Sequence, residues 1–431
     1  MASSLRPRRE QARVALLGFG TVGQSVARIL CSGEVPAIAL THIFNRNIAR
    51  KRASWVPSSV CWTESVADII ASDVDIVIEV VGGLRPAGEW VRAALIAGKS
   101  VVTANKQLIA HEGPELVELA RSHGLEIRFE ASVAGGIPVL RALQDGLAGD
   151  RLVETIGILN GTCAYILSRM ESAGIPFALA LAEAQTAGYA EADPTEDVDG
   201  ADAAAKLAIL TAIGLRAPIR AADIAKRSIR PVTQVDFEYA KTLGCTIRQV
   251  ARASVEADGP VLASVGPALV PRASAFGRIA GSQNLVTVRG VFGGETSFTG
   301  SGAGGSPTAV AVVSDLLSIH RGVSQVAASA AVEPREVSGD FCAPRYVRFT
   351  VRDRPGIIAT VGAAFARHAI NLEAVVQQPN HPKDRLPFVT TLEACAESLV
   401  DRALAEIASL DWIVERPLSL PIFSGTLGVG A

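Results

Sequence analysis

An acidic segment that leads into an apolar helix carries the residues best suited to chemistry. It reads GYAEADPTEDVDGADAAAKLAIL, from Gly188 to Leu210, and includes Glu191, Asp197, Asp202 and Lys206. Asp202 and Lys206 are four residues apart, so they share a helix face and could form an ordinary stabilising pair. The Ala and Leu residues around Lys206 favour instead an ammonium group directed into a site. There it could protonate the alkoxide that forms when a hydride reaches an aldehyde, while neighbouring carboxylates hold the α-ammonium of an amino acid.

A glycine motif, GFGTVG, lies between an apolar strand and a helical stretch near the start of the chain. Gly18 would allow the tight turn, Gly20 the close approach of backbone to a pyrophosphate, and Gly23 the close packing of helix on strand. A glycine turn of purely structural use is the alternative. The motif predicts a dinucleotide-binding loop made of Gly18, Phe19, Gly20, Thr21, Val22 and Gly23.

The end of the second predicted strand indicates which nicotinamide cofactor is used. NAD(H) binding usually requires an Asp or Glu about 20 residues past the glycines, where it bonds the ribose 2′-hydroxyl. This place holds Phe44-Asn45-Arg46-Asn47, and Arg50, Lys51 and Arg52 follow. A basic segment without acids favours NADP(H) over NAD(H), with Arg46 near the 2′-phosphate, although a solvated basic loop would look the same.

The elements that must position these residues alternate between strands and helices in the first part of the chain. This alternation predicts an α/β domain with a doubly wound parallel sheet of the Rossmann type, followed by an α+β domain with longer helices and a small β-α-β unit. Strands are expected at 14–17, 38–44, 75–83, 100–104 and 126–129, and helices at 24–31, 89–97 and 115–122. The expected domains are 13–134 with 305–322, 135–304 and 346–425, with a linker at 323–345.

Five motifs together resemble the long bacterial form of homoserine dehydrogenase over nearly the whole chain. Besides the two above, they are VVTANK (101–106), EASVAGGIP (130–138) and GILNGTCAYIL (157–167). The resemblance implies a reversible, NADPH-dependent reduction of L-aspartate 4-semialdehyde to L-homoserine, in threonine, methionine and isoleucine biosynthesis. One departure is Ala164, where family members usually have Asn.

The resemblance also implies roles for individual residues. Lys206 is the proton donor or acceptor, Glu191 and Asp202 bind substrate, and Asp197 supports them. Lys106 lies where the family places a lysine near both nicotinamide and substrate, so which lysine moves the proton stays open. Gly188 and Gly302 contact the cofactor from the other side.

A cation loop is implied at EASVAGGIP, where sodium or another monovalent cation would be held by backbone carbonyls. The implied ligands are Glu130, Val133, Gly135 and Ile137. From its residues alone, this stretch is expected to be a strand that runs into an interdomain hinge.

The last unit resembles an ACT domain, which has a ferredoxin-like fold. DRPG (353–356) opens its first helix, and Ile370-Asn371-Leu372 starts the next strand. Such domains bind amino-acid effectors, usually at a domain pair, so feedback inhibition by L-threonine is our hypothesis. The alternative is a domain used only for contacts in a homodimer or homotetramer.

Composition limits the other possible functions. The 431 residues are 49% hydrophobic and 19% charged, with a net charge of -2. These values argue against disorder and against nucleic-acid or membrane binding, and no leader sequence is evident, so we expect a cytoplasmic enzyme. The alternatives are another NADP-linked amino-acid semialdehyde dehydrogenase and a non-catalytic nucleotide or amino-acid sensor, which would have no use for the acidic segment.

Overall fold

The computed structural model describes residues 10–256, 259–323, 335–379 and 381–423. The chain divides into two compact units. The first is drawn from Met1–Thr155, Ala205–Ala222 and Asn284–Arg335, and the second from Ile156–Ala204, Asp223–Gln283 and Glu336–Ala431. Within the described ranges, no helix has both the length and the apolar character needed to cross a bilayer.

A parallel six-stranded sheet, in the order β3-β2-β1-β4-β5-β6, organises the first unit. This is the strand order of a doubly wound dinucleotide-binding fold, so the predicted fold class is confirmed. Its strands consist mostly of consecutive apolar residues, because helices cover both faces of the sheet. They are β1 (Ala12–Leu17), β2 (Ile38–Phe44), β3 (Cys61–Thr63), β4 (Ile76–Glu79), β5 (Ser100–Thr103) and β6 (Ile127–Arg128).

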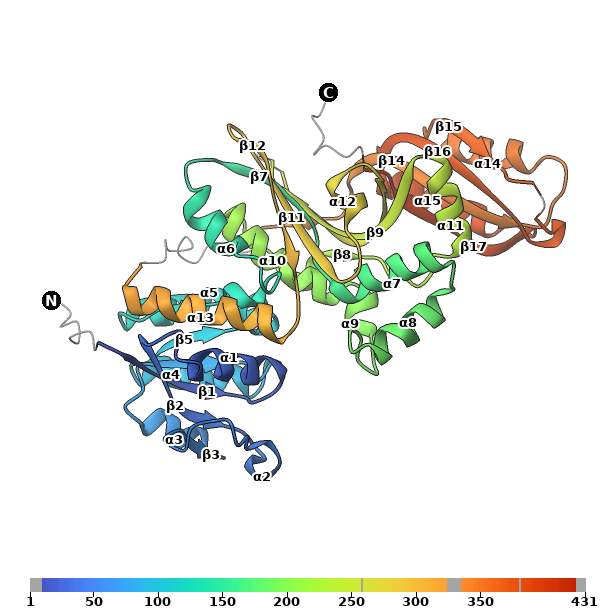
Figure 1. Ribbon diagram of the computed structural model, residues 1–431. Coiled ribbons are helices and arrows are strands. Elements are labelled where there is room, and N and C mark those ends of the chain that lie inside the picture. Colours follow the sequence, from blue (N-terminus) through green and yellow to red (C-terminus); the bar gives the residue numbers. More distant parts are fainter. Residues whose placement is uncertain (1–9, 257–258, 324–334, 380, 424–431) are drawn as a thin grey trace. The chain divides into compact units, whose positions relative to one another are not determined.

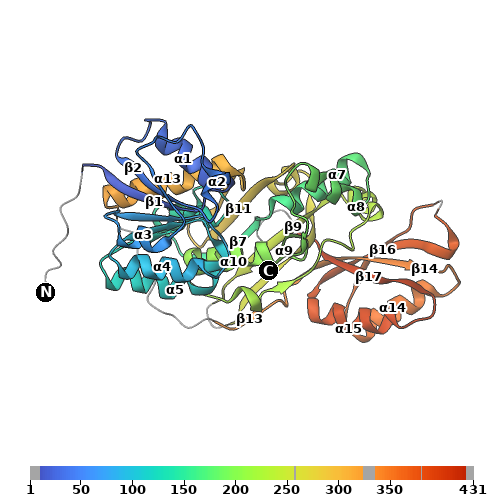
Figure 2. The ribbon, with the colours of Figure 1, turned by 90° about the horizontal axis from the view of Figure 1, so that it is seen from below.

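Helices lie on the two faces of this sheet. Helices α1 (Thr21–Cys31) and α13 (Gly305–Arg321) cover one face, and α4 (Ala87–Ile96) and α5 (Lys106–Ser122) cover the other (Figure 2). Residues Ala309, Val312 and Leu316 of α13 belong to the same apolar core as Val14 of β1. The helix after Gly305 therefore packs in the first unit although it is distant in sequence. The two remaining helices of this part are α2 (Ile48–Lys51) and α3 (Val66–Ala71).

A second, mixed sheet has the strand order β12-β11-β7-β9-β10-β13, and β8 pairs with β10. Its strands are β7 (Leu152–Ile158), β8 (Ala225–Lys226), β9 (Cys245–Ser254), β10 (Val261–Pro271), β11 (Gln283–Gly290), β12 (Gly294–Ser301) and β13 (Val337–Ser338). The helices of this middle part are α6 (Val139–Arg141), α7 (Gly161–Ala173), α8 (Phe177–Thr186), α9 (Thr195–Val198), α10 (Ala201–Gly214), α11 (Gln234–Thr242) and α12 (Ala275–Arg278). Figure 1 labels most of these elements along the chain.

The C-terminal part has the element order βαββαβ of a ferredoxin-like fold. Its antiparallel sheet runs β15-β16-β14-β17, with α14 and α15 on one face. The other face contributes Tyr346, Val389 and Leu420 to a core shared with α7 and α11. The elements are β14 (Cys342–Val351), α14 (Ile357–Arg367), β15 (Leu372–Val376), β16 (Leu386–Ala396), α15 (Glu397–Ala408) and β17 (Ile413–Pro421).

Several element boundaries differ from those expected. The helix placed at 115–122 begins at Lys106, because Asn105 caps it: the Asn105 side chain accepts a hydrogen bond from the Leu108 amide. Helix α11 and strand β12 were not foreseen. Residues 324–334 of the expected linker and 424–425 of the expected last domain lie outside the described residues. The described end of the linker contains β13 and the beginning of β14.

Candidate active site

The glycine loop has the geometry that its motif predicts. Gly18 has a φ of +104°, and a Cβ there would lie 3.0 Å from the Val80 carbonyl oxygen. A Cβ on Gly23 would lie 2.2 Å from the Gly18 carbonyl oxygen, so the third glycine is required for helix α1 to approach the turn. Gly20, by contrast, has nothing within 4 Å of its Cβ position. The loop therefore leaves open space at the start of α1, where a pyrophosphate would fit.

The basic segment follows directly on β2. Arg46, Arg50, Lys51 and Arg52 are all exposed. The backbone here is ordered by side-chain caps: Asn47 accepts from the Arg50 amide (3.2 Å). Four exposed cations therefore follow the carboxyl end of β2, where folds that bind NAD usually carry an acid.

Lys106 is the first residue of α5, at the carboxyl end of β5. A polar network supports this corner of the sheet. The Glu79 carboxylate accepts from the Thr103 hydroxyl (2.6 Å) and from the amides of Val81 and Gly82. The Asn105 amide donates to the Gly83 carbonyl (2.7 Å). These contacts fix the backbone that presents Lys106.

The predicted cation loop is buried and sharply turned. Ala134 and Gly135 are consecutive left-handed residues, with φ of 54° and 48°. The carbonyl of Glu130 accepts from the Val133 amide (3.3 Å) and that of Ile137 from the Val139 amide (2.7 Å). Because a carbonyl oxygen has two lone pairs, both could still ligate a hard cation, so the loop fits a monovalent ion.

Two buried carboxyl groups anchor this loop. Asp315 of α13 accepts from the Glu130 amide (2.9 Å), and the Glu130 carboxylate accepts from the amides of Leu140 and Arg141. Burial, and then the Asp315 charge, raise the pKa of Glu130 to about 7. Burial likewise raises the pKa of Asp315 to about 6, although Arg141 pairs with it at 3.1 Å. The loop is therefore tied to the helix that returns to the first unit.

The turn from Gly302 to Gly305 lies against two other parts of the first unit. A Cβ on Gly135 would lie 2.6 Å from the Gly302 carbonyl oxygen. A Cβ on Gly305 would lie 2.6 Å from the Ser25 hydroxyl and 3.1 Å from the Thr21 carbonyl oxygen of α1. Gly302 is thus in contact with the cation loop, and the turn reaches the glycine-loop helix.

In the second unit, the carboxylates of the acidic segment are held together by one amide. Asn160 caps α7 through its side-chain oxygen, which accepts from the Cys163 amide (2.7 Å). Its amide nitrogen donates to both Asp197 (2.6 Å) and Asp202 (2.8 Å). Asn160 and Asp202 are buried. One amide therefore holds these two acidic groups together.

Lys206 lies one turn beyond Asp202 on α10, as the spacing predicts. It is partly exposed, whereas its neighbours Ala205 and Leu207 are buried. The side chain therefore leaves an otherwise buried stretch of helix.

Glu191 and Gly188 belong to an exposed turn after α8. The Thr162 hydroxyl of α7 donates to the Tyr189 carbonyl (2.7 Å), and the rings of Tyr165 and Tyr189 lie 4.7 Å apart. Gly188 has a φ of +77°, which favours glycine. The Glu191 side chain is exposed, and its backbone carbonyl accepts from the Gln185 amide. The turn is pinned to α7, the helix that Asn160 caps.

Sequence reasoning gave no role to Asn160, Asn105 or Glu79. A signal was available for the two asparagines, since Asn is a favoured N-cap and each precedes a helix. Ala164 is buried in the first turn after Asn160. Nothing in the structure explains its departure from the family pattern.

Comparisons with known proteins assign each part of the chain to a family. A model of homoserine dehydrogenase matches residues 138–317, a model of the homoserine dehydrogenase NAD binding domain matches 18–130, and an ACT domain model matches 345–411. A homoserine dehydrogenase of Synechocystis sp. is 37% identical, covering 96% of this chain and 99% of the relative. The crystal structure of a homoserine dehydrogenase from Thiobacillus denitrificans has a TM-score of 0.88 and 33% identity, covering 96% of this chain and 99% of that one. A hyperthermophilic archaeal homoserine dehydrogenase in complex with NADPH has a TM-score of 0.63 and 26% identity, covering 74% of this chain and all of that one.

The doubly wound sheet and its glycine turn define a dinucleotide-binding domain. With the family matches, they place the chain among the NAD(P)-dependent oxidoreductases that act on a CH–OH group. The full-length relatives make the assignment specific. The chain belongs to the homoserine dehydrogenase family, with a catalytic domain and a C-terminal ACT domain. Its reaction is the interconversion of L-aspartate 4-semialdehyde and L-homoserine, and the resemblance seen in the sequence is confirmed.

Proposed function

We propose that this homoserine dehydrogenase reduces L-aspartate 4-semialdehyde with NADPH in preference to NADH, and that Lys206 supplies the proton. The observation that carries the substrate assignment is the Asn160 amide that holds Asp197 and Asp202 together. Two carboxylates fixed in this way give an α-ammonium group a defined position. Lys206 follows Asp202 by one helical turn on α10, which supports its assignment as the group that meets the aldehyde.

The proposed proton transfer uses one side chain. A nicotinamide cofactor held by residues 18–23 would supply the hydride that the carbonyl carbon receives. The Lys206 ammonium donates a proton from Nζ to the carbonyl oxygen, which becomes the hydroxyl of L-homoserine, and solvent then restores the ammonium. In the reverse direction, neutral Lys206 accepts the hydroxyl proton. Asp202 and Asp197 bind the α-ammonium group, with Glu191 as a further ligand.

Lys106 is the second basic group of the proposed site. Its position at the start of α5, supported by Glu79, Thr103 and Asn105, suits a charge that orients the carbonyl and contacts the nicotinamide. We assign it orientation of the substrate rather than transfer of the proton.

The preference for NADPH rests on the basic segment after β2. Arg46 would pair with the 2′-phosphate, while residues 18–23 would cradle the pyrophosphate. Gly188 and Gly302 would approach the cofactor from the other side. The archaeal relative in complex with NADPH supports this choice.

Sodium, or another monovalent cation, is proposed as a structural ion of the loop that contains Glu130, Val133, Gly135 and Ile137. A cation held by four backbone carbonyls would fix the path of the chain between residues 130 and 138. The buried contact between Asp315 and the Glu130 amide supports a loop of defined shape.

The organisation of the chain completes the proposal. We propose a nucleotide-binding domain at 13–134 with 305–322, a substrate and dimerisation domain at 135–304, and an ACT domain at 346–425 that binds L-threonine as a feedback inhibitor. The enzyme is proposed to be a cytoplasmic homodimer or homotetramer. The matched ACT region, at 345–411, supports an amino-acid effector.

The proposal is tested by following oxidation of the reduced nicotinamide with L-aspartate 4-semialdehyde. We expect kcat/KM with NADPH to exceed that with NADH about tenfold or more, since one lost charge-assisted contact costs about 1.5–3 kcal/mol. A preference for NADH would overturn the cofactor assignment. Added L-threonine should lower the rate, and an unchanged rate at all threonine concentrations would remove the regulatory claim.

A further inference from the structure

We propose that residues 227–230, here called the tie segment, position the side-chain carboxylates of Asp197 and Asp202. The tie segment does so by linking the acidic segment to the first turns of helix α15 in the ACT domain. Arg227 is the positioning residue. The inference rests on the proposed function, because it assumes that Asp197 and Asp202 bind substrate.

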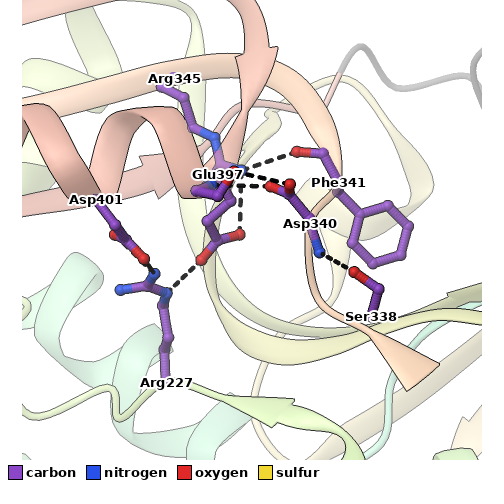
Figure 3. Close-up of polar contacts among 8 residues, drawn as sticks. Arg227, Ser338, Asp340, Phe341, Arg345, Glu397 and Asp401 are labelled. Carbon is purple, nitrogen blue, oxygen red and sulfur yellow. Dashed lines mark hydrogen bonds and ion pairs between the residues drawn. The ribbon is translucent and has the colours of Figure 1, made fainter. Parts of the chain in front are cut away.

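One end of the tie segment is bound to α15. Arg227 Nε donates to Glu397 Oε1 (2.5 Å), and Arg227 Nη2 donates to both carboxylate oxygens of Asp401 (2.7 and 3.0 Å) (Figure 3). Glu397 and Asp401 are one turn apart on α15, so the guanidinium spans two consecutive turns of that helix. Because the guanidinium is planar and bonds two carboxylates, the orientation of the Arg227 side chain is fixed as well as its charge neutralised.

The first turn of α15 is itself held in place. Arg345, which is 1% exposed, donates to the other oxygen of Glu397 (3.0 Å) and to the Phe341 carbonyl (3.1 Å). Asp340 accepts from both the backbone amide and the hydroxyl of Ser398 (2.8 Å each). Glu397 therefore lies between two arginines. A movement of α15 would displace Glu397 and, with it, the Arg227 side chain.

The other end of the tie segment is bound to the acidic segment. The Ser228 hydroxyl donates to Asp199 (2.5 Å), Arg230 Nε donates to the same oxygen (3.3 Å), and the Ile229 amide donates to the Val198 carbonyl (3.0 Å). Val198 and Asp199 lie between Asp197 and Asp202, the two carboxylates that share the Asn160 amide.

There is little room for the two segments to shift independently. The Arg227 amide donates to the Val265 carbonyl of β10 (2.8 Å). A Cβ on Gly200, which has a φ of +90°, would lie 3.1 Å from the Val265 side chain. The tie segment and the residue that precedes α10 are thus packed on the same residue of one strand. A displacement of one is transmitted to the other, because close-packed groups cannot compress.

The contact at Arg227 is suited to positioning rather than to holding the domain. Its side chain is 44% exposed and that of Asp401 is 51% exposed, although that of Glu397 is 18% exposed. Ion pairs that are largely exposed add little to stability. The ACT sheet has a separate, buried attachment, in which Arg348 pairs with Asp236 (2.5 Å) and the Tyr346 hydroxyl donates to Asp236 (2.8 Å). Loss of Arg227 should therefore leave the domain docked while it releases the tie segment. An amino acid bound to the ACT domain could shift α15. The tie segment would transmit that shift to the carboxylates of Asp197 and Asp202.

The test compares full-length variants by kinetics and hydrogen exchange. For Arg227→Met we expect the KM for L-homoserine to rise about threefold or more, with kcat within about twofold and the KM for NADP unchanged. Asp401→Asn and Asp401→Ala leave the Glu397–Arg345 contact intact, and each should give part of this rise. Either one combined with Arg227→Met should add nothing further, and Arg227→Lys should restore part of the loss. Amide exchange in residues 195–204 should accelerate in Arg227→Met.

Arg367→Met is the matched control, since Arg367 pairs with Glu406 near the other end of α15. It should leave both readouts at wild-type values. An unchanged KM for L-homoserine in Arg227→Met, or effects of Arg227→Met and the α15 variants that simply add, would overturn the inference. A chain without dehydrogenase activity would count against the proposed function, but the exchange measurement would still decide whether Arg227 holds residues 195–204.

Discussion

The nucleotide-binding region and the proposed substrate-binding region are shaped by different interactions. Around the glycine loop, the close approach of backbone segments leaves no room for side chains. Position 23 requires glycine because a Cβ there would lie 2.2 Å from the Gly18 carbonyl oxygen. Around the acidic segment, the chain uses charged side chains that are oriented by an amide, with Asn160 bridging Asp197 and Asp202. The first region is shaped by sterics, and the second by electrostatics.

This difference predicts how each region fails. A misfit in the glycine loop displaces backbone, so its effect falls on cofactor binding and, where atoms overlap, on folding as well. A lost charge in the acidic segment leaves the backbone in place and changes substrate binding or proton transfer. The following variants separate these two kinds of failure.

Lys206→Ala should have the largest effect, because it removes the proposed proton donor. A positioned acid contributes about 10²- to 10⁴-fold, so kcat should fall by about that range while the Kd for NADPH stays within about twofold. Steady-state kinetics and a fluorescence titration with NADPH measure the two quantities. Lys106→Ala is the comparison, and it should raise the KM for substrate more than it lowers kcat. If Lys106→Ala lost kcat by orders of magnitude and Lys206→Ala did not, the two roles would be reversed.

Two glycine variants test the steric region. Gly23→Ala forces a Cβ into the Gly18 carbonyl, and overpacking costs about 1–3 kcal/mol, so the Kd for NADPH should rise about tenfold or more and Tm should fall. Gly20→Ala has room for its Cβ in the protein, so Tm should stay constant while NADPH binds more weakly. Gly146→Ala, in open space outside the loop, is the control for both measurements. Equal Tm losses at positions 20 and 23 would contradict the distinction.

The same contrast explains what the sequence could predict. The glycine motif is a local pattern, since Gly18, Gly20 and Gly23 lie within one strand, turn and helix, and these glycines were predicted. The close approach of Gly18 to Val80 joins distant residues and was not predicted. Asp202 and Lys206 share one helix, so their common face was also predictable. The Asn160 bridge was missed because it joins residues 37 and 42 positions apart, and such a contact depends on the tertiary fold. The early start of α5 was missed for a local reason, because Asn105 was not recognised as its cap.

Asn160 variants test the electrostatic region. Asn160→Ser keeps an oxygen that can cap α7 but loses the amide that holds the two carboxylates, whereas Asn160→Ala loses both functions. We expect the KM for L-homoserine to rise about tenfold in each variant, because a hydrogen bond to a charged group is worth about 1.5–3 kcal/mol. Only Asn160→Ala should also lower Tm, by about the value of one cap. A normal KM in Asn160→Ser would show that the cap, and not the bridge, is what substrate binding needs.

The smallest expected effect is that of replacing Arg46. This residue would add an electrostatic contribution to nucleotide binding, which is otherwise governed by the shape of the glycine loop. Because Arg46 is exposed and Arg50, Lys51 and Arg52 lie close by in sequence, its removal should cost only about 0.5–1 kcal/mol of NADPH binding. Arg46→Ala should therefore lower kcat/KM for NADPH about two- to fivefold and leave NADH unaffected. The effect should shrink as salt is added, since exposed charges are screened over about 8 Å at physiological ionic strength. The loss at Gly20→Ala should not shrink with salt, because a Cβ in the way of a pyrophosphate acts by overlap rather than by charge.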